Sequence, residues 1–323
     1  MERSTGSGTS RRAAIATAGA LVVAMAGGAA PALGSAVASS PATAASAPVV
    51  NGDILVTING NLYLIKPNGT NLRKLTTGGH IADAEFSPDG RRIAFHKRLA
   101  DGKQYLFVRS VAGGGVVKLG QGSNPSWSPD GTRLAFINSR GVCVMPVRAG
   151  ASSKVLVANY EDQDGPVVHL DVDWSRSGGR MAVTRWYYIY EHRLAEVNVV
   201  SDRTGAIQRT HDGISPEFSR DGSALAVQRY EPYSGPEFGV DIVDVATGAV
   251  TELTPRDVDR RTYAPIWSPD GSRLAVRENG PARPDDGILN LATISATDGS
   301  VIATLIPGST GRNIIPRDWR AAS

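Results

Sequence analysis

One short pattern recurs along this chain: an aromatic residue, a serine, two residues of varying type and a glycine, followed by an apolar stretch. Five copies are complete, and a sixth aromatic residue near the C-terminus has no turn after it. The steps between successive copies are 41, 47, 44, 49 and 52 residues, close to the repeat of about 40–50 residues that builds one propeller blade. We call the six aromatic residues the anchor residues: Phe86, Trp127, Trp174, Phe218, Trp267 and Trp319. Their spacing predicts an all-β propeller.

The segment after each anchor residue has the composition of a tight turn between two strands. Proline presets φ at the second position of such a turn, aspartate binds nearby backbone amides, and glycine adopts a positive φ at low cost. Apolar runs after the turn, and alternating segments such as 104–108 and 240–245, predict three further strands in each repeat. We therefore interpret four aspartates as turn formers: Asp89, Asp130, Asp221 and Asp270.

The two ends of the predicted propeller supply complementary parts of one blade. Residues 53–77 contain three predicted strands without an inner strand, and the segment around Trp319 contains an inner strand without the other three. Pairing the C-terminal strand with the N-terminal strands completes a sixth blade and leaves no long exposed sheet edge. The sequence therefore predicts a six-bladed propeller of four-stranded blades over residues 51–323.

The five turns in register resemble the TolB-type, WD40-like propeller repeat found in TolB, tricorn protease and the propellers of dipeptidyl peptidases. The resemblance covers residues 51–323 and implies the propeller fold, in a family that includes scaffolds, transport accessories and gating domains of peptidases. TolB also has an α/β domain before its propeller, and the peptidase relatives carry a nucleophile within Gly-x-Ser-x-Gly on a separate domain. We expect the propeller alone, since the sequence has no such motif.

The first fifty residues differ from the rest in composition. Arg11 and Arg12 precede a run of small and apolar residues, 13–30, and small-residue cleavage sites follow at 36–38 and 45–47. These elements predict a secretory signal peptide at 1–38, with cleavage that could extend to 47, and a flexible linker at 39–50. The paired arginines also fit a twin-arginine export signal. We expect a secreted or cell-envelope protein, and the alternative is an uncleaved membrane anchor.

Charge and cysteine content restrict the class of partner. Removing the leader, with Arg3, Arg11, Arg12 and Glu2, lowers the formal net charge from +3 to +1 and leaves no basic block. We therefore predict no nucleic-acid partner, no membrane span after signal cleavage and a monomer. The single cysteine, Cys143, cannot form an internal disulfide and lies in an apolar strand, where we expect it to be buried.

The residue before the anchor residue is acidic in four of the six repeats: Glu85, Asp173, Glu217 and Asp318. Because inner strands line the channel of a propeller, these carboxylates are expected to converge near one of its ends, with Asp83 and Asp171 on the same side of their strands. Close carboxylates repel one another unless a cation or a basic group neutralises them. Two alternatives follow: a Ca²⁺ ion or cationic ligand binds in the channel, or each acid pairs with an arginine of a neighbouring blade or faces water.

Long insertions fall on the face opposite the tight turns, where recognition loops of rigid scaffolds often lie. They are residues 159–165, 186–192, 230–238, 256–261 and 278–287.

Two of these insertions are rich in aromatic residues and belong to neighbouring repeats. They predict a ligand-binding aromatic patch made of Trp186, Tyr187, Tyr190, Tyr230, Tyr233 and Phe238. The alternative is that the aromatic residues of 186–190 extend a strand and pack between blades.

The leading functional hypothesis is an exported, non-enzymatic binding or scaffold propeller that recognises a protein or cell-envelope ligand through its long-loop face. The alternative is a metal-assisted hydrolase, similar to propeller lactonases, that uses the channel carboxylates. The five histidines have no metal-binding spacing. No catalytic residue is assigned, and the only cofactor considered is the Ca²⁺ ion of the channel hypothesis.

Overall fold

The computed structural model describes residues 49–189, 192–230, 238–255, 261–278, 289–309 and 312–322. The chain divides into two units, Met1–Ser46 and Ala47–Ser323, and every described residue belongs to the second unit. The predicted signal peptide and the linker up to residue 48 lie outside the described residues. No helix of sufficient length and hydrophobicity to span a bilayer occurs in the described part of the chain.

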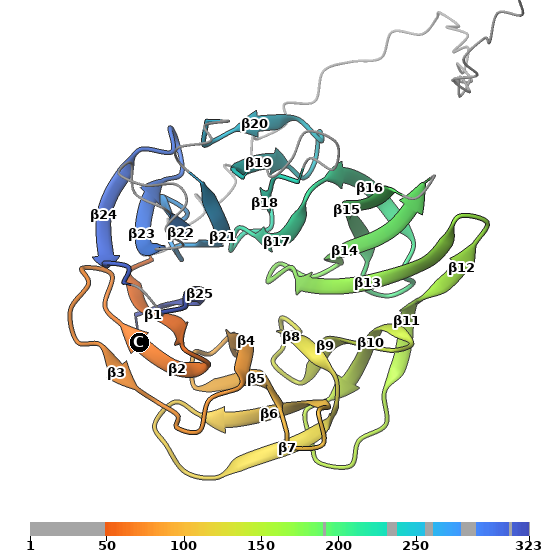
Figure 1. Cartoon of the computed structure of the whole chain (residues 1–323), viewed down its shortest axis with the longest axis horizontal. Coiled ribbons are helices and arrows are strands. Elements are labelled where there is room, and N and C mark those ends of the chain that lie inside the picture. Colours follow the sequence, from red (N-terminus) through yellow and green to blue (C-terminus); the bar gives the residue numbers. More distant parts are fainter. Residues whose placement is uncertain are drawn as a thin grey trace, which may run out of the picture. The chain divides into compact units, whose positions relative to one another are not determined.

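Six antiparallel sheets form a ring around a central channel (Figure 1), which confirms the predicted all-β, six-bladed propeller. We number the blades from the one that holds β1, and name the strands of each blade from the channel outward. Blade 1 contains β25 (Ile314–Ala321), β1 (Asn51–Ile58), β2 (Asn61–Ile65) and β3 (Arg73–Lys74); blade 2 contains β4 (Ile81–Phe86), β5 (Arg92–Arg98), β6 (Gln104–Ser110) and β7 (Val116–Gln121); blade 3 contains β8 (Ser123–Trp127), β9 (Arg133–Asn138), β10 (Gly141–Pro146) and β11 (Lys154–Ala158).

The other three blades repeat this order, and one of them has an additional strand. Blade 4 contains β13 (Gly165–Trp174), β14 (Arg180–Ile189), β15 (His192–Ser201) and β16 (Ile207–Asp212), with β12 (Tyr160–Asp162) added beside β13; blade 5 contains β17 (Ile214–Phe218), β18 (Ala224–Gln228), β19 (Val240–Asp244) and β20 (Val250–Glu252); blade 6 contains β21 (Thr262–Trp267), β22 (Arg273–Glu278), β23 (Asn290–Ser295) and β24 (Val301–Ile306). The insertion at 159–165, expected to be a loop, thus forms part of a β-hairpin that extends blade 4.

The ring is closed by the two ends of the described unit. Strand β25 pairs antiparallel with β1, and Trp319 faces Ile54 in the register while Asp318 faces Leu55. This pairing confirms the predicted closure of the C-terminal strand on the N-terminal strands. The inner strand of blade 1 is therefore the last element of the chain.

The turns after the anchor residues have the predicted geometry. In blade 2 the hydroxyl of Ser87 donates to Asp89 Oδ1 at 2.5 Å and accepts from the backbone N–H of Arg92 at 2.9 Å. Gly90 has φ 68° and donates its N–H to the carbonyl of Ser87. In blade 3 the hydrogen bonds from Ser128 and from the next turn residues lower the pKa of Asp130 to about 2. These aspartates act as turn formers, as the sequence indicates.

Each interface between neighbouring blades holds its own apolar core. The core between blades 2 and 3 contains Leu106 and Cys143 around Trp127, and the next core contains Val142 around Trp174. Both tryptophans are almost completely buried, and such large rings contribute heavily to packing energy. Cys143 is buried and unpaired, as expected from the sequence. Six such interfaces make a stiff ring that fixes the side chains of the inner strands around the channel.

Candidate functional site

The residue before an anchor residue joins its blade to the next blade around the channel. At four consecutive interfaces its side chain accepts a hydrogen bond from the backbone N–H of the next anchor residue, and we call these four the clasp residues. The bonds run from Phe86 to Asp318 Oδ2 (2.7 Å), from Trp127 to Glu85 Oε2 (2.9 Å), from Trp174 to Ser126 Oγ (2.9 Å) and from Phe218 to Asp173 Oδ2 (2.7 Å). The acidic position therefore has a structural use, since buried N–H groups need an acceptor.

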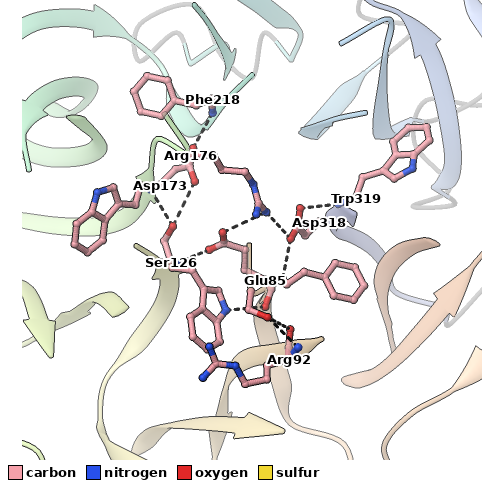
Figure 2. Close-up of polar contacts among 12 residues, drawn as sticks. Glu85, Arg92, Ser126, Asp173, Arg176, Phe218, Asp318 and Trp319 are labelled. Atoms are coloured by element: carbon pink, nitrogen blue, oxygen red, sulfur yellow. Dashed lines mark hydrogen bonds and ion pairs between the residues drawn. The ribbon is translucent and has the colours of Figure 1, made fainter. Parts of the chain in front are cut away.

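Arg176 points into the channel among these carboxylates (Figure 2). It belongs to the turn between β13 and β14 and stands at the position held by proline in the turns of Pro88, Pro129 and Pro269. Its Nη2 lies 3.0 Å from Asp318 Oδ2 and 3.4 Å from Glu85 Oε1. One guanidinium from blade 4 thus forms ion pairs with blades 1 and 2 across the channel.

Burial and mutual repulsion shift the titration of this cluster. Burial raises the pKa of Glu85 well above its ordinary value although Arg176 opposes the shift, and it raises the pKa of Asp173 to about 6. Burial also raises the pKa of Glu217 well above its ordinary value, and the nearby Asp173 adds to that shift. Burial alone lowers the pKa of Arg176, but the carboxylates of Asp318 and Glu85 raise it above its ordinary value. The arginine stays charged and stabilises the acids as a group.

The structure brings the four acidic residues proposed from the sequence to one channel. Glu85, Asp173 and Asp318 are clasp residues, and Glu217 lines the channel beside them. The sequence interpretation missed Arg176, although its presence at a proline position of the repeat was visible. A basic partner does neutralise Glu85 and Asp318, but it comes from across the channel. Within the described ranges no group of three or more His, Cys, Asp or Glu side chains could hold a metal ion, and the Ca²⁺ site stays a prediction.

The end of the channel away from the tight turns, which we call the loop end, opens into a cavity of about 130 Å³. The six residues three positions before an anchor residue all line it, and four of them have positive φ: Asp83 (35°), Asn124 (48°), Ser215 (50°) and Ala264 (47°). The other two are Asp171 and Pro316. Positive φ is costly for residues other than glycine and is often found at functional positions. Register shifts in the strand pairing accompany these residues in each blade.

Charged groups at the loop end form a second network. Arg317 and His96 both contact Asp83, the latter at 3.3 Å between Nδ1 and Oδ2. Asn124 Nδ2 donates to Asp171 Oδ1 at 3.1 Å. Burial raises the pKa of Asp171 to about 7, and the neighbouring Asp83 adds to the shift. Burial lowers the pKa of His96 in spite of Asp83. Asp171 therefore titrates near neutral pH.

The aromatic residues proposed as a ligand-binding patch fall into separate places. Trp186 and Tyr230 form an edge-to-face pair with ring centroids 5.2 Å apart, and the guanidinium of Arg193 lies 3.8 Å from the centroid of Trp186. Tyr187 follows Trp186 on β14 and so faces the other side of the sheet, with Arg185 over its ring at 4.6 Å.

The remaining members of that patch are not joined to this pair. Phe238 packs against Tyr263 at 4.7 Å between ring centroids. Tyr190 and Tyr233 lie outside the described residues. The structure therefore brings together Trp186 and Tyr230, and residues 186–189 belong to an extended β14, as in the alternative interpretation.

Blade 4 extends beyond its neighbours at the loop end. Strands β13, β14 and β15 each have ten residues, and β12 pairs with the first residues of β13. Large apolar side chains are exposed on this extension, including Tyr160 (50%), Leu170 (40%) and Ile189 (36%). We call β12, residues 165–170, residues 185–189 and residues 192–196 the blade 4 extension.

Comparison with known proteins agrees with this architecture. TolB from Acinetobacter baumannii superposes with a TM-score of 0.62 at 18% sequence identity, over 83% of this chain and 66% of that chain. The chain has the fold of a TolB-type propeller. Tricorn protease shares the TolB-type fold with a TM-score of 0.55 and 14% identity, over 81% of this chain and 27% of that chain.

A comparison of amino-acid sequences gives a further similarity. The chain is 26% identical over 216 residues to the uncharacterized peptidase YuxL of Bacillus subtilis (strain 168), which covers 62% of this chain and 29% of that protein. No protein-family model matches the chain. The chain therefore spans less than a third of this curated relative and about two thirds of the TolB chain.

Proposed function

We propose that this chain is an exported, non-enzymatic binding propeller that recognises a protein or cell-envelope ligand through the blade 4 extension and the adjoining part of blade 5. The observation that carries the proposal is the pair of Trp186 and Tyr230 with Arg193 stacked on it at the loop end. Aromatic residues and arginine are the types enriched at energetically important positions of interfaces.

The setting of this pair suits a recognition surface. Trp186 and Tyr230 are half-buried, and the hydroxyl of Tyr230 donates to the carbonyl of Arg193 at 3.3 Å. The pair therefore joins blade 4 to blade 5 and holds its rings in one orientation. The exposed Tyr160, Leu170 and Ile189 add apolar area on the same extension. A rigid surface loses little conformational entropy when a ligand binds.

The proposed export rests on residues 1–38, whose composition is that of a signal peptide. Mass spectrometry of the protein produced in a bacterial host is the measurement. Cleavage after residue 38 or residue 47 supports the signal, and an intact N-terminus in the membrane fraction supports the anchor instead.

Partner capture from cell-envelope extracts tests the binding surface. We expect the wild-type chain to retain a protein or glycan that the Trp186→Ala, Tyr230→Ala double variant releases. Tyr105→Ala is the matched control, because Tyr105 also has a stacked cation, Lys118 at 3.4 Å, but lies on blade 2. Retention of the same partner by the double variant, or equal loss in the control, would show that this surface is not the binding site.

The second candidate is a metal-assisted hydrolase that uses Glu85, Asp173, Glu217 and Asp318. The name of the Bacillus subtilis relative, an uncharacterized peptidase, is the reason to consider a hydrolase. Against a cation at these carboxylates stands Arg176, which already forms ion pairs with Glu85 and Asp318. Thermal unfolding with increasing Ca²⁺ distinguishes the binding propeller from the metal-assisted hydrolase. A rise in the unfolding temperature that disappears in a Glu85→Gln, Asp173→Asn, Glu217→Gln variant favours the metal site.

A further inference from the structure

The end of the channel at the tight turns, the turn end, carries a feature that the binding hypothesis above does not use. A cavity of about 850 Å³ lies beside the channel there and is lined by residues of blades 1, 2, 4 and 5. Its volume is within the range of small-molecule sites, about 300–1,000 Å³. We propose that this cavity binds a small polyanion with two or more carboxylate or phosphate groups.

Positive charge dominates the lining of the cavity. Five arginines line it, and the only acidic lining residue is Asp89. Asp89 is held by the hydroxyl of Ser87 and the backbone of its own turn, which lower its pKa. The five arginines are Arg73, Arg91, Arg176, Arg220 and Arg320. The cavity therefore has an excess of fixed positive charge that an anion would neutralise.

These arginines divide into two groups by their partners. Arg176 is paired with Asp318, and Arg320 is paired with Asp53 and donates to the carbonyl of Gly90 at 3.0 Å. The other three, Arg73, Arg91 and Arg220, are exposed and form no side-chain hydrogen bond or ion pair with any residue that the structure describes. Paired arginines hold the cavity in shape, and the three others are free to bind a ligand.

A departure from the repeat adds one of these free arginines. Arg220 stands in the turn of blade 5 where Pro88, Pro129 and Pro269 stand in other blades. Blades 4 and 5 are the two blades with arginine at this position, and Arg176 and Arg220 both line the same cavity. A turn does not need arginine there, because proline satisfies its φ requirement. The substitution does add a positive charge next to the channel.

Arginine chemistry indicates the class of ligand. The guanidinium group is a planar fork whose N–H groups match carboxylate and phosphate oxygens in pairs. Arg91 and Arg220 come from turns of separate blades, so a ligand that contacts both needs anionic groups at more than one place. Phe86, Val111 and Trp319 also line the cavity and are apolar. A polyanion with a short carbon or phosphate skeleton fits this combination.

Isothermal titration calorimetry of the full chain at low ionic strength tests the proposal with two probes, citrate for carboxylates and tripolyphosphate for phosphates. We expect binding of at least one probe, weakened at least about tenfold in the Arg91→Gln, Arg220→Gln variant, which corresponds to about 1.4 kcal/mol. The more tightly bound probe identifies the anionic group.

The control variant, Arg98→Gln with Arg148→Gln, removes the same charge from two exposed arginines that do not line the cavity. We expect it to bind the probe as the wild type does. The inference is overturned if neither probe binds the wild type, or if both variants weaken binding equally. A Trp186→Ala, Tyr230→Ala variant should bind the probe normally, so that failure of the proposed partner surface and failure of this site are distinguished.

Discussion

The two ends of the channel are built from the same six inner strands, yet they place charge and strain differently. At the turn end the positive φ angles belong to glycines such as Gly90 and Gly271, and the carboxylates accept backbone N–H bonds and pair with Arg176. At the loop end positive φ falls on Asp83, Asn124, Ser215 and Ala264. There Asp171 lines the cavity among other polar groups and titrates near neutral pH.

This difference indicates that acidic residues around a propeller channel have different roles at its two ends. The acids at the turn end hold neighbouring blades together, and their charge is offset within the protein. The loop end has strained backbone at four positions, a property that a protein retains at some cost in stability. The predictions below change one end at a time, from the largest expected effect to the smallest.

Replacing Arg176 by methionine is expected to have the largest effect on stability. Glu85 and Asp318 would stay buried without their basic partner, and removing one member of such a network costs about 3–5 kcal/mol. The measurement is the free energy of unfolding by chemical denaturation at pH 7. At pH 5 the loss should shrink, because Glu85 and Glu217 have raised pKa values and gain protons.

The control for this change is Arg220→Met, at the same turn position of blade 5 but exposed. It should alter the free energy of unfolding by less than about 0.5 kcal/mol. Equal losses in the two variants would mean that the channel carboxylates do not depend on Arg176.

Ser126→Ala tests a clasp residue without changing charge. Ser126 is 2% exposed, and its hydroxyl is the acceptor for the backbone N–H of Trp174 at 2.9 Å. Loss of that acceptor leaves a buried N–H unsatisfied, and we expect a destabilisation of about 1–3 kcal/mol. Ser123→Ala on the same strand is the control, since Ser123 is half-buried. An unchanged free energy of unfolding in Ser126→Ala would show that this hydrogen bond does not stabilise the packing of blades.

Asp171→Asn tests the loop end through pH. The folded-state pKa of Asp171 is about 7, raised from an ordinary value of 3.8. Its contribution to stability is therefore fully present below pH 4 and is lost as pH rises through 7. Asparagine stays neutral, so the variant should be more stable than the wild type at pH 8 and equal to it at pH 4. Thermal unfolding of both proteins from pH 4 to pH 8 measures the difference in stability. Parallel pH profiles of the two proteins would contradict the prediction.

Ala264→Gly addresses the backbone strain, with the smallest expected effect. Alanine at φ 47° is strained by about 1–2 kcal/mol, whereas glycine adds roughly 0.4–1 kcal/mol of entropy to the unfolded chain. The variant should be more stable by up to about 1 kcal/mol. Ala275→Gly, on the regular strand β22, should instead be destabilising. Destabilisation by both changes would show that positive φ at Ala264 carries no strain.

Much of the fold was predictable because it depends on local chemistry. The anchor residues and the turns around Asp89 and Asp130 act within a few residues of the chain, so their spacing indicated the propeller repeat. The complementary partial repeats at residues 53–77 and around Trp319 then gave the number of blades and the closure. The convergence of Glu85, Asp173, Glu217 and Asp318 on one channel followed from their equivalent places in the repeat.

The rest depends on contacts between distant parts of the sequence. Arg176 reaches Asp318 across 142 residues, and no local pattern encodes that distance. The hairpin of β12 and the pairing of Trp186 with Tyr230 depend on how far blade 4 extends beside blade 5. Sequence alone also left open whether the residues of 186–190 extend a strand or belong to a recognition loop.

Closure of the ring by β25 has a consequence for folding cooperativity. Asp318 lies on this strand, and it accepts the N–H of Phe86 while it pairs with Arg176. Docking of the last strand therefore joins the ends of the ring and offsets the charge of Arg176 in a single step. A partly closed ring lacks both contacts of Asp318, so such intermediates are penalised and the six blades should unfold in one transition, although each interface between blades has a separate core.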